Sequence, residues 1–136
     1  MEKIYKVKTN LTKEMAKDMQ NKMTPAESDF ISKIKVSAYD YFGEDGLAVS
    51  YMLISKLEFL KILHFLKSKG VIVEHSEITE DVLLGKFSFK GTDIEKDVDS
   101  FIQKNLTLDN VLDKINLSGV DSLSDYDKNI LEKNNK

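Results

Sequence analysis

The fold of this chain is decided by residues 34–54, which read IKVSAYDYFGEDGLAVSYMLI. Residues 34–42 alternate between apolar and polar side chains, as a half-buried strand does. The pair Asp45-Gly46 favours the positive φ values that a tight hairpin turn requires. Residues 47–54 are nearly continuous in apolar side chains, which predicts a returning central strand covered on both faces.

Two further strands and three helices are expected around this hairpin. Residues 3–9 and 71–74 read as short strands, and a stripe of apolar residues at every fourth position predicts a helix between Leu11 and Met23. Capping boxes at Thr24–Glu27 and Ser55–Glu58 predict two more helices, the first short and burying Phe30 together with Ile31 or Ile34. The order is then βαββαβ with one added helix, so we expect an α+β fold with a ferredoxin-like antiparallel sheet.

The second part of the chain predicts short amphipathic helices. Residues 86–90 are consistent with an additional edge strand, and apolar side chains at helical spacing follow in residues 93–104, 108–115 and 126–131. We therefore expect two domains, an α/β core over residues 1–90 and a helical extension over residues 91–136. The extension either packs on the core or docks a partner.

The carboxy-terminal tail from residue 108, LDNVLDKINLSGVDSLSDYDKNILEK, carries a recognisable pattern. Its Leu-Asp-x-x-Leu-Asp-Lys-Ile run, Ser-Gly, Asp-Ser-Leu and acidic-lysine helix resemble a short helical tail found in Bacteroidetes proteins, including some rhomboid-family proteases. Ser124 replaces the usual threonine, and Asp125 and Asp127 replace the usual glutamates. The resemblance is limited to residues 108–136 and implies a bacterial origin and a self-contained hairpin that docks on a partner, without any protease activity.

Composition excludes several classes of chemistry. The chain has 136 residues, a net charge of −3 and no cysteine, so disulfides, thiolate metal sites and cysteine nucleophiles are ruled out. All 20 basic residues are lysine, which is typical of an AT-rich bacterial or phage genome and removes bidentate guanidinium contacts. No window approaches the roughly 18 apolar residues of a membrane span, and no signal-like run begins the sequence. We therefore expect a cytoplasmic protein that does not insert into a membrane.

Catalytic constellations are sparse. The sequence contains neither a Gly-x-Ser-x-Gly elbow nor a phosphate-binding glycine loop, and His64 lies within an amphipathic helix. We expect no catalytic residue and no cofactor. A small enzyme or metal-binding protein stays an alternative at His75, where Glu74, Glu77, Glu80 and Asp81 are near in sequence.

Single-stranded nucleic acid is a second alternative. Tyr39 and Tyr41 share one face of their strand, and Tyr5 and Tyr51 lie on neighbouring strands. Aromatic side chains on an open sheet face can stack bases, and residues 1–35 are rich in lysine. The acidic sequence pI near 5.4 argues against strong phosphate binding.

The leading prediction is a non-catalytic protein-interaction module, acting as an adaptor or regulator. An inhibitor or immunity-type protein of a bacterium or phage fits the same pattern, and a homo-oligomer stays open. Sheet edges and amphipathic helices are the recognition elements that such a module uses. The expected contact residues fall in two sets, the hairpin set Tyr39, Tyr41 and Phe42 and the tail set Leu123, Tyr126 and Ile130.

Overall fold

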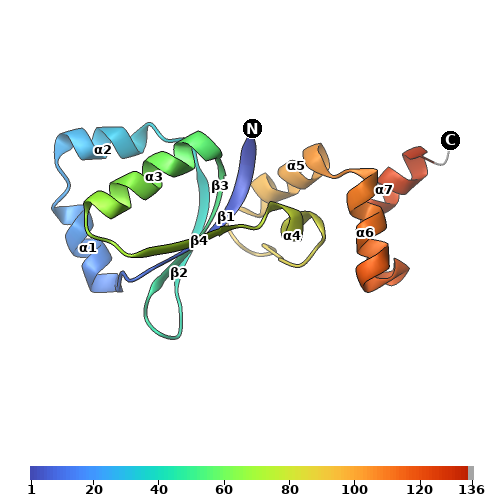
Figure 1. Cartoon of the computed structure of the whole chain (residues 1–136), viewed down its shortest axis with the longest axis horizontal. Helices are drawn as coiled ribbons and strands as arrows, with labels where there is room; N and C mark the ends of the chain where they lie inside the picture. Colours follow the sequence, from blue (N-terminus) through green and yellow to red (C-terminus); the bar gives the residue numbers. More distant parts are fainter. Residues whose placement is uncertain (135–136) are drawn as a thin grey trace. The chain divides into compact units, whose positions relative to one another are not determined.

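The computed structural model describes residues 1–134, and residues 135 and 136 lie outside the described part. The chain divides into two compact units, Met1–Glu77 and Ile78–Lys136 (Figure 1). The first unit combines a sheet with helices and the second contains helices, so the α+β prediction is confirmed. The expected boundary at 90/91 falls inside the second unit, because residues 78–90 cluster with the helices that follow them.

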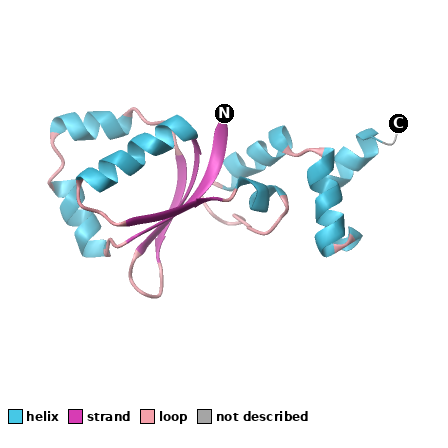
Figure 2. Ribbon diagram, viewed as in Figure 1, coloured by secondary structure: helices cyan, strands magenta, loops and turns pink. Residues whose placement is uncertain are grey.

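A four-stranded antiparallel sheet forms the centre of the first unit (Figure 2). Its strand order is β2-β3-β1-β4, so β1 and β3 are central and β2 and β4 are the edges. The four strands have these bounds: β1 Glu2–Thr9, β2 Ser37–Phe42, β3 Ala48–Ser55 and β4 Val73–Glu77.

The predicted hairpin joins β2 to β3. The Gly43 N–H donates to the Leu47 carbonyl at 2.9 Å, and Gly46 has the positive φ of 76° that its place in the turn requires. The Asp45 carboxylate accepts a hydrogen bond from the Leu47 N–H at 3.0 Å. These contacts fix the register of the two strands.

Three helices begin at side-chain caps, and the sequence predicts the caps of the second and third. They are α1 Lys13–Asn21, α2 Pro25–Ser32 and α3 Lys56–Ser68. Thr24 and Glu27 form both bonds of a capping box at the start of α2. Ser55 accepts from the Glu58 N–H at 3.3 Å, while the Glu58 carboxylate pairs with Lys61.

The core of this unit lies between the sheet and the helices. It includes a cluster of six buried side chains: Tyr5, Val7, Ile34, Ile54, Phe59 and Leu63. Each stabilises the fold by roughly 1.5–3 kcal/mol through burial of apolar surface. Ile31 packs against this cluster, whereas Phe30 is exposed; the expected burial of Phe30 is therefore wrong.

Up to residue 134, the second unit contains five short helical segments. They are α4 Thr79–Leu83, α5 Glu95–Asn105, α6 Leu108–Ser118, the 3-10 helix η1 Val120–Ser122 and α7 Asp125–Asn134. Its core includes Val82, Leu83, Val98, Phe101 and Val111.

The edge strand expected over residues 86–90 does not form. Instead the Lys86 N–H bonds the Asp81 carbonyl at 2.9 Å, and Gly85 and Gly91 have positive φ on either side. These constraints turn the segment back on α4 and prevent an extended strand. Within residues 1–134, every helix falls short of the length and hydropathy that crossing a bilayer requires.

Candidate functional site

Strand register brings tyrosines and lysines together on one face of the sheet. Tyr39 is opposite Tyr51, Tyr51 is opposite Lys6, and Lys6 is opposite Ser76, so one row crosses all four strands. The next row on this face contains Tyr41, Val49, Lys8 and Glu74. We call the surface of Tyr39, Tyr41, Tyr51, Lys6 and Lys8 the tyrosine face.

The three tyrosine rings of this face form a cluster. The centroids of Tyr39 and Tyr41 are 5.5 Å apart, and those of Tyr41 and Tyr51 are 6.4 Å apart. Lys6 Nζ lies 5.9 Å from the Tyr51 ring centroid, within the range of a cation–π contact. Tyr41 is 38% exposed, while Tyr39 and Tyr51 are half-buried. The cluster therefore presents both ring surface and hydroxyl groups.

Charges at the hairpin end of this face are paired. Lys8 Nζ lies 3.1 Å from Asp45 Oδ2, and this hydrogen bond raises the pKa of Lys8. The pKa of Asp45 is lowered mainly by the hydrogen bond from the Leu47 N–H, and to a smaller extent by the hydrogen bond from Lys8. Burial raises the pKa of Tyr41, as does its hydrogen bond with Tyr51. The face thus combines aromatic rings with fixed charges of both signs.

Only part of the predicted hairpin set lies on the tyrosine face. Tyr39 and Tyr41 share it, but Phe42 is on the opposite face because side chains alternate along a strand, and it is 43% exposed. Tyr5, expected beside the other tyrosines, also lies on the opposite face. It stacks on Phe59 in the core with ring centroids 3.8 Å apart, and burial raises its pKa.

The predicted tail set lies at the junction of η1 with α7 and on α7 itself. Leu123 directly follows η1, and Tyr126 and Ile130 are one turn apart on α7; all three are half-buried. Three apolar side chains on α6 and η1 are more exposed. Leu112 belongs to the apolar stripe predicted over residues 108–115, whereas Leu117 and Val120 were not singled out from the sequence. Leu117 lies outside the apolar stripe of its helix, and this break in the periodicity is the sequence signal that its side chain is exposed.

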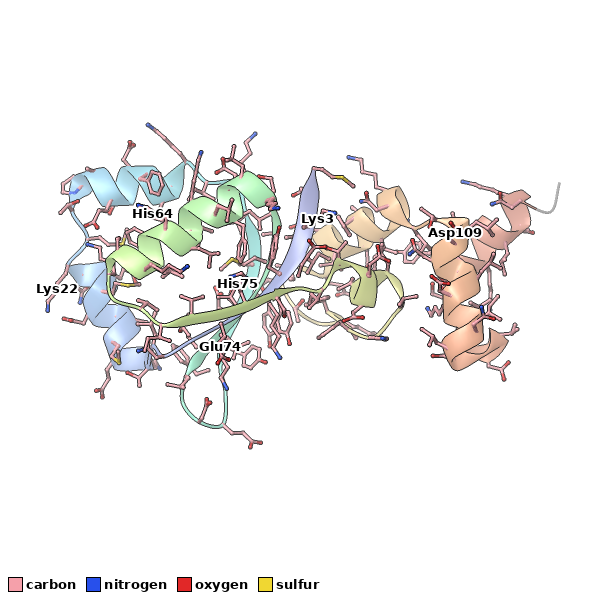
Figure 3. The ribbon with its side chains drawn as sticks, in the orientation of Figure 1. Lys3, Lys22, His64, Glu74, His75 and Asp109 are labelled. Carbon is pink, nitrogen blue, oxygen red and sulfur yellow. The ribbon has the colours of Figure 1, made fainter. Side chains whose placement is uncertain are left out.

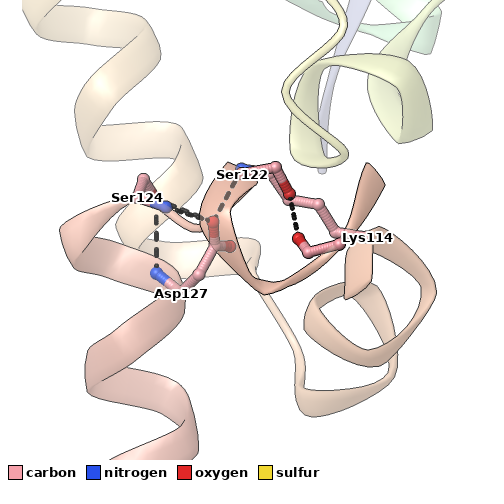
Figure 4. Close-up of polar contacts among 5 residues, drawn as sticks. Lys114, Ser122, Ser124 and Asp127 are labelled. Atoms are coloured by element: carbon pink, nitrogen blue, oxygen red, sulfur yellow. Dashed lines mark hydrogen bonds and ion pairs between the residues drawn. The ribbon is translucent and has the colours of Figure 1, made fainter. Parts of the chain in front are cut away.

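A buried ion pair, also missed from the sequence, joins α6 to the start of α7 (Figure 4). Lys114 Nζ donates to Asp127 Oδ2 at 2.7 Å, and the same oxygen accepts from the N–H and hydroxyl of Ser124. Burial raises the pKa of Asp127, but Lys114 and Ser124 outweigh it and hold the pKa below its ordinary value. Serine is a common capping residue, so a cap at Ser124 can be read from the sequence, whereas the lysine partner of Asp127 cannot.

The histidines do not converge with acids. His75 and Glu74 point to opposite sides of β4, and His64 is exposed on α3 (Figure 3). The His75 ring stands edge-on to Phe59 with centroids 5.4 Å apart. Among residues 1–134, no three His, Asp or Glu side chains are grouped as a metal site needs.

A cleft of about 320 Å³ lies beside α1 and the end of α3. Its apolar floor includes Leu11, Met15, Met19 and Val71. Two lysines line it and both are paired with acids, Lys22 with Asp18 at 3.0 Å and Lys69 with Glu27. The cleft therefore has an apolar floor and a neutralised rim.

This chain matches no protein-family model, no curated protein and no solved structure.

Proposed function

We propose that this chain is a non-catalytic protein-interaction module, an adaptor or regulator, that binds its partner through the tyrosine face. The observation that carries the proposal is the gathering of Tyr39, Tyr41 and Tyr51 beside Lys6 on one sheet face. Tyrosine is enriched at interface hot spots because its ring buries apolar area while its hydroxyl keeps a hydrogen bond. The strand order β2-β3-β1-β4 supports assigning the first unit to the ferredoxin-like architecture. The tyrosine face lies opposite the Tyr5–Leu63 cluster, and buried Ile4, Val49 and Leu53 share this face with the tyrosines.

Charge on the tyrosine face favours a protein partner over a polyanion. Lys6 and Lys8 share the face with Glu74, and Asp45 pairs with Lys8 at its end. A mixed rim around aromatic anchors is the usual composition of a protein interface. An inhibitor or immunity-type role in a bacterium or phage is one form of this proposal.

The double variant Tyr39→Ala and Tyr41→Ala tests it. We expect affinity for a partner enriched from the native host to fall about 30-fold or more, since losing a hot spot costs about 2 kcal/mol. The measurement is isothermal titration of the purified partner, with circular dichroism to verify folding.

Tyr126→Ala is the matched control, because Tyr126 is a half-buried tyrosine of the tail set. The control variant is expected to bind as the unmodified chain does. If Tyr126→Ala fails to bind the partner while the double variant binds fully, the interface lies on the tail and the proposal is contradicted.

Single-stranded nucleic acid is a second candidate, favoured by one specific arrangement. Tyr39, Tyr51 and Lys6 lie in one row across β2, β3 and β1, which places rings and a cation where successive bases stack. Under this proposal a fluorescently labelled oligothymidine or mixed RNA 12-mer binds at low salt. Tyr51→Ala is then expected to weaken binding by about 1–3 kcal/mol, the usual value of one base stack.

Fluorescence anisotropy at several salt concentrations measures this binding. A steep loss of affinity with salt is expected, because lysine–phosphate contacts release counterions. An unchanged anisotropy at the lowest salt concentration would remove nucleic acid as a ligand.

A further inference from the structure

The two edge strands of the sheet differ in how they are protected. Charged side chains on an edge strand discourage pairing with another chain. β4 carries Glu74, His75 and Glu77 over its five residues. β2, with sequence SAYDYF, carries a single acid and no lysine. Of the two edges, β2 is therefore the better template for an added strand.

The direction of the β2 backbone groups follows from the hairpin. Gly43 and Leu47 share a hydrogen bond, and hydrogen-bonded pairs alternate along an antiparallel ladder. The pairs 41/49 and 39/51 are therefore of the hydrogen-bonded type. The Ala48 N–H, which bonds the Leu11 carbonyl at 2.8 Å, points to the β1 side and agrees with this pattern.

It follows that Ala38, Asp40 and Phe42 direct their N–H and C=O groups away from β3. Asp40 and Phe42 are exposed, and Ala38 is half-buried. Within residues 1–134, no turn, loop or helix donates a backbone hydrogen bond to these three residues or accepts one from them. This edge thus offers three donors and three acceptors in one row.

We propose that β2 binds an extended segment of a partner protein, which adds a fifth strand to the sheet. This inference rests on the proposed protein-interaction function and gives its binding mode. Backbone hydrogen bonds supply affinity in such an addition, and alternate side chains supply specificity.

Side chains beside the edge define the chemistry of that segment. On one face, residues of the added strand lie next to Tyr39 and Tyr41, and apolar or aromatic side chains fit there. On the other face they lie next to Asp40 and Phe42, and a lysine or arginine at the position nearest Asp40 gives opposite-charge pairing. The partner segment therefore alternates apolar residues with a central basic residue.

A proline substitution separates this binding mode from a contact by side chains alone. Ala38→Pro removes an outward-facing N–H, and proline is tolerated on an edge strand where the N–H is outside the ladder. Ser37 already has the extended conformation that a residue before proline adopts. Ala38→Ser keeps the N–H and is the matched control.

The probe is a displayed library of random ten-residue peptides, selected against the full chain. We expect enriched peptides to have apolar residues at alternate positions around a lysine or arginine. We expect Ala38→Pro to lower the affinity for a synthetic enriched peptide about tenfold, and Ala38→Ser to leave that affinity unchanged. Hydrogen exchange on the unmodified chain gives a second readout that does not depend on variant folding. Bound peptide is expected to protect the amides of Ala38, Asp40 and Phe42 and to leave those of Tyr39 and Tyr41 unchanged.

Two results would overturn the inference. One is enrichment of peptides that leave the three outward amides unprotected, or no enrichment at all. The other is a natural partner whose affinity is unchanged by Ala38→Pro but lost in the double variant Tyr39→Ala and Tyr41→Ala. That second result would leave the protein-interaction proposal standing with a different binding mode.

Discussion

At the scale of single residues, Asp127 is a buried ionisable group of the second unit that several hydrogen bonds hold in place. It is 1% exposed, and its Oδ2 atom accepts three hydrogen bonds, from Lys114 Nζ and from the N–H and hydroxyl of Ser124. A buried carboxylate without partners would become neutral. Here the lysine and the helix cap together keep the charged form, so one residue both takes part in the cap of α7 and ties this helix to α6.

Asp127→Asn should therefore destabilise the second unit in a pH-dependent way. The pKa of Asp127 is lower in the folded chain than its unfolded value of about 3.9. A lowered folded pKa adds stability that is fully present above the unfolded pKa and is lost as pH falls through the folded pKa. At pH 7 we expect the variant to lose about 1.5–3 kcal/mol of unfolding free energy, the usual value for hydrogen bonds to a charged group. The difference should shrink below about pH 4.

The measurement is the unfolding free energy in urea at pH 7, 5 and 3, monitored through the amide NMR peaks of α6 and α7. Asp125→Asn is the matched control, because Asp125 is an exposed aspartate in the same helical turn. A constant difference between the Asp127 variant and the unmodified chain at all three pH values would contradict the role of the carboxylate charge.

At the scale of helices and strands, local signals predicted the start of α2 and the turn between β2 and β3, whereas the strand expected over residues 71–74 is shifted to Val73–Glu77. The Thr24-Pro25 start of α2 and the Asp45-Gly46 turn both depend on residues within a few positions of one another. Such contacts are readable from sequence because chain connectivity already brings the groups together.

Faces of strands were harder to predict, because they depend on register between distant segments. Tyr5 and Tyr51 are on adjacent strands, but Tyr5 is opposite Met52 and Lys6 is opposite Tyr51. This offset of one residue sends the two rings to opposite faces. Tyr5 then stacks on Phe59, a partner whose position the pattern around Tyr5 does not specify. Tyr39 and Tyr41 were placed together correctly, since residues two apart on one strand share a face.

At the scale of the whole molecule, the two units each have their own buried apolar side chains. The first contains the cluster around Ile54 and Phe59, and the second contains the core around Phe101 and Val111. The sequence placed the boundary at 90/91 because residues 86–90 resembled a strand that would extend the sheet. Without that strand, residues 78–90 belong with the second unit, where α4 contacts α5.

Two fragments, residues 1–77 and residues 1–90, test this division. Residues 1–77 retain all six residues of the Tyr5–Leu63 cluster, so we expect this fragment to fold alone. Residues 1–90 also carry Ile78, Val82, Leu83 and Phe89, which are buried in the full chain. Without α5, the α4 side chains lack their neighbours, and each exposed apolar side chain forfeits roughly 1.5–3 kcal/mol of burial.

The longer fragment should therefore be the more prone to self-association, although it contains more of the chain. Exposed apolar patches bind hydrophobic dyes and promote self-association, so we expect residues 1–90 to enhance ANS fluorescence and to sediment as oligomers. Residues 1–77 should sediment as a monomer with a dispersed amide NMR spectrum. The opposite outcome, a monomeric 1–90 fragment beside an unfolded 1–77 fragment, would mean that residues 78–90 complete the sheet unit and that the boundary lies near residue 90.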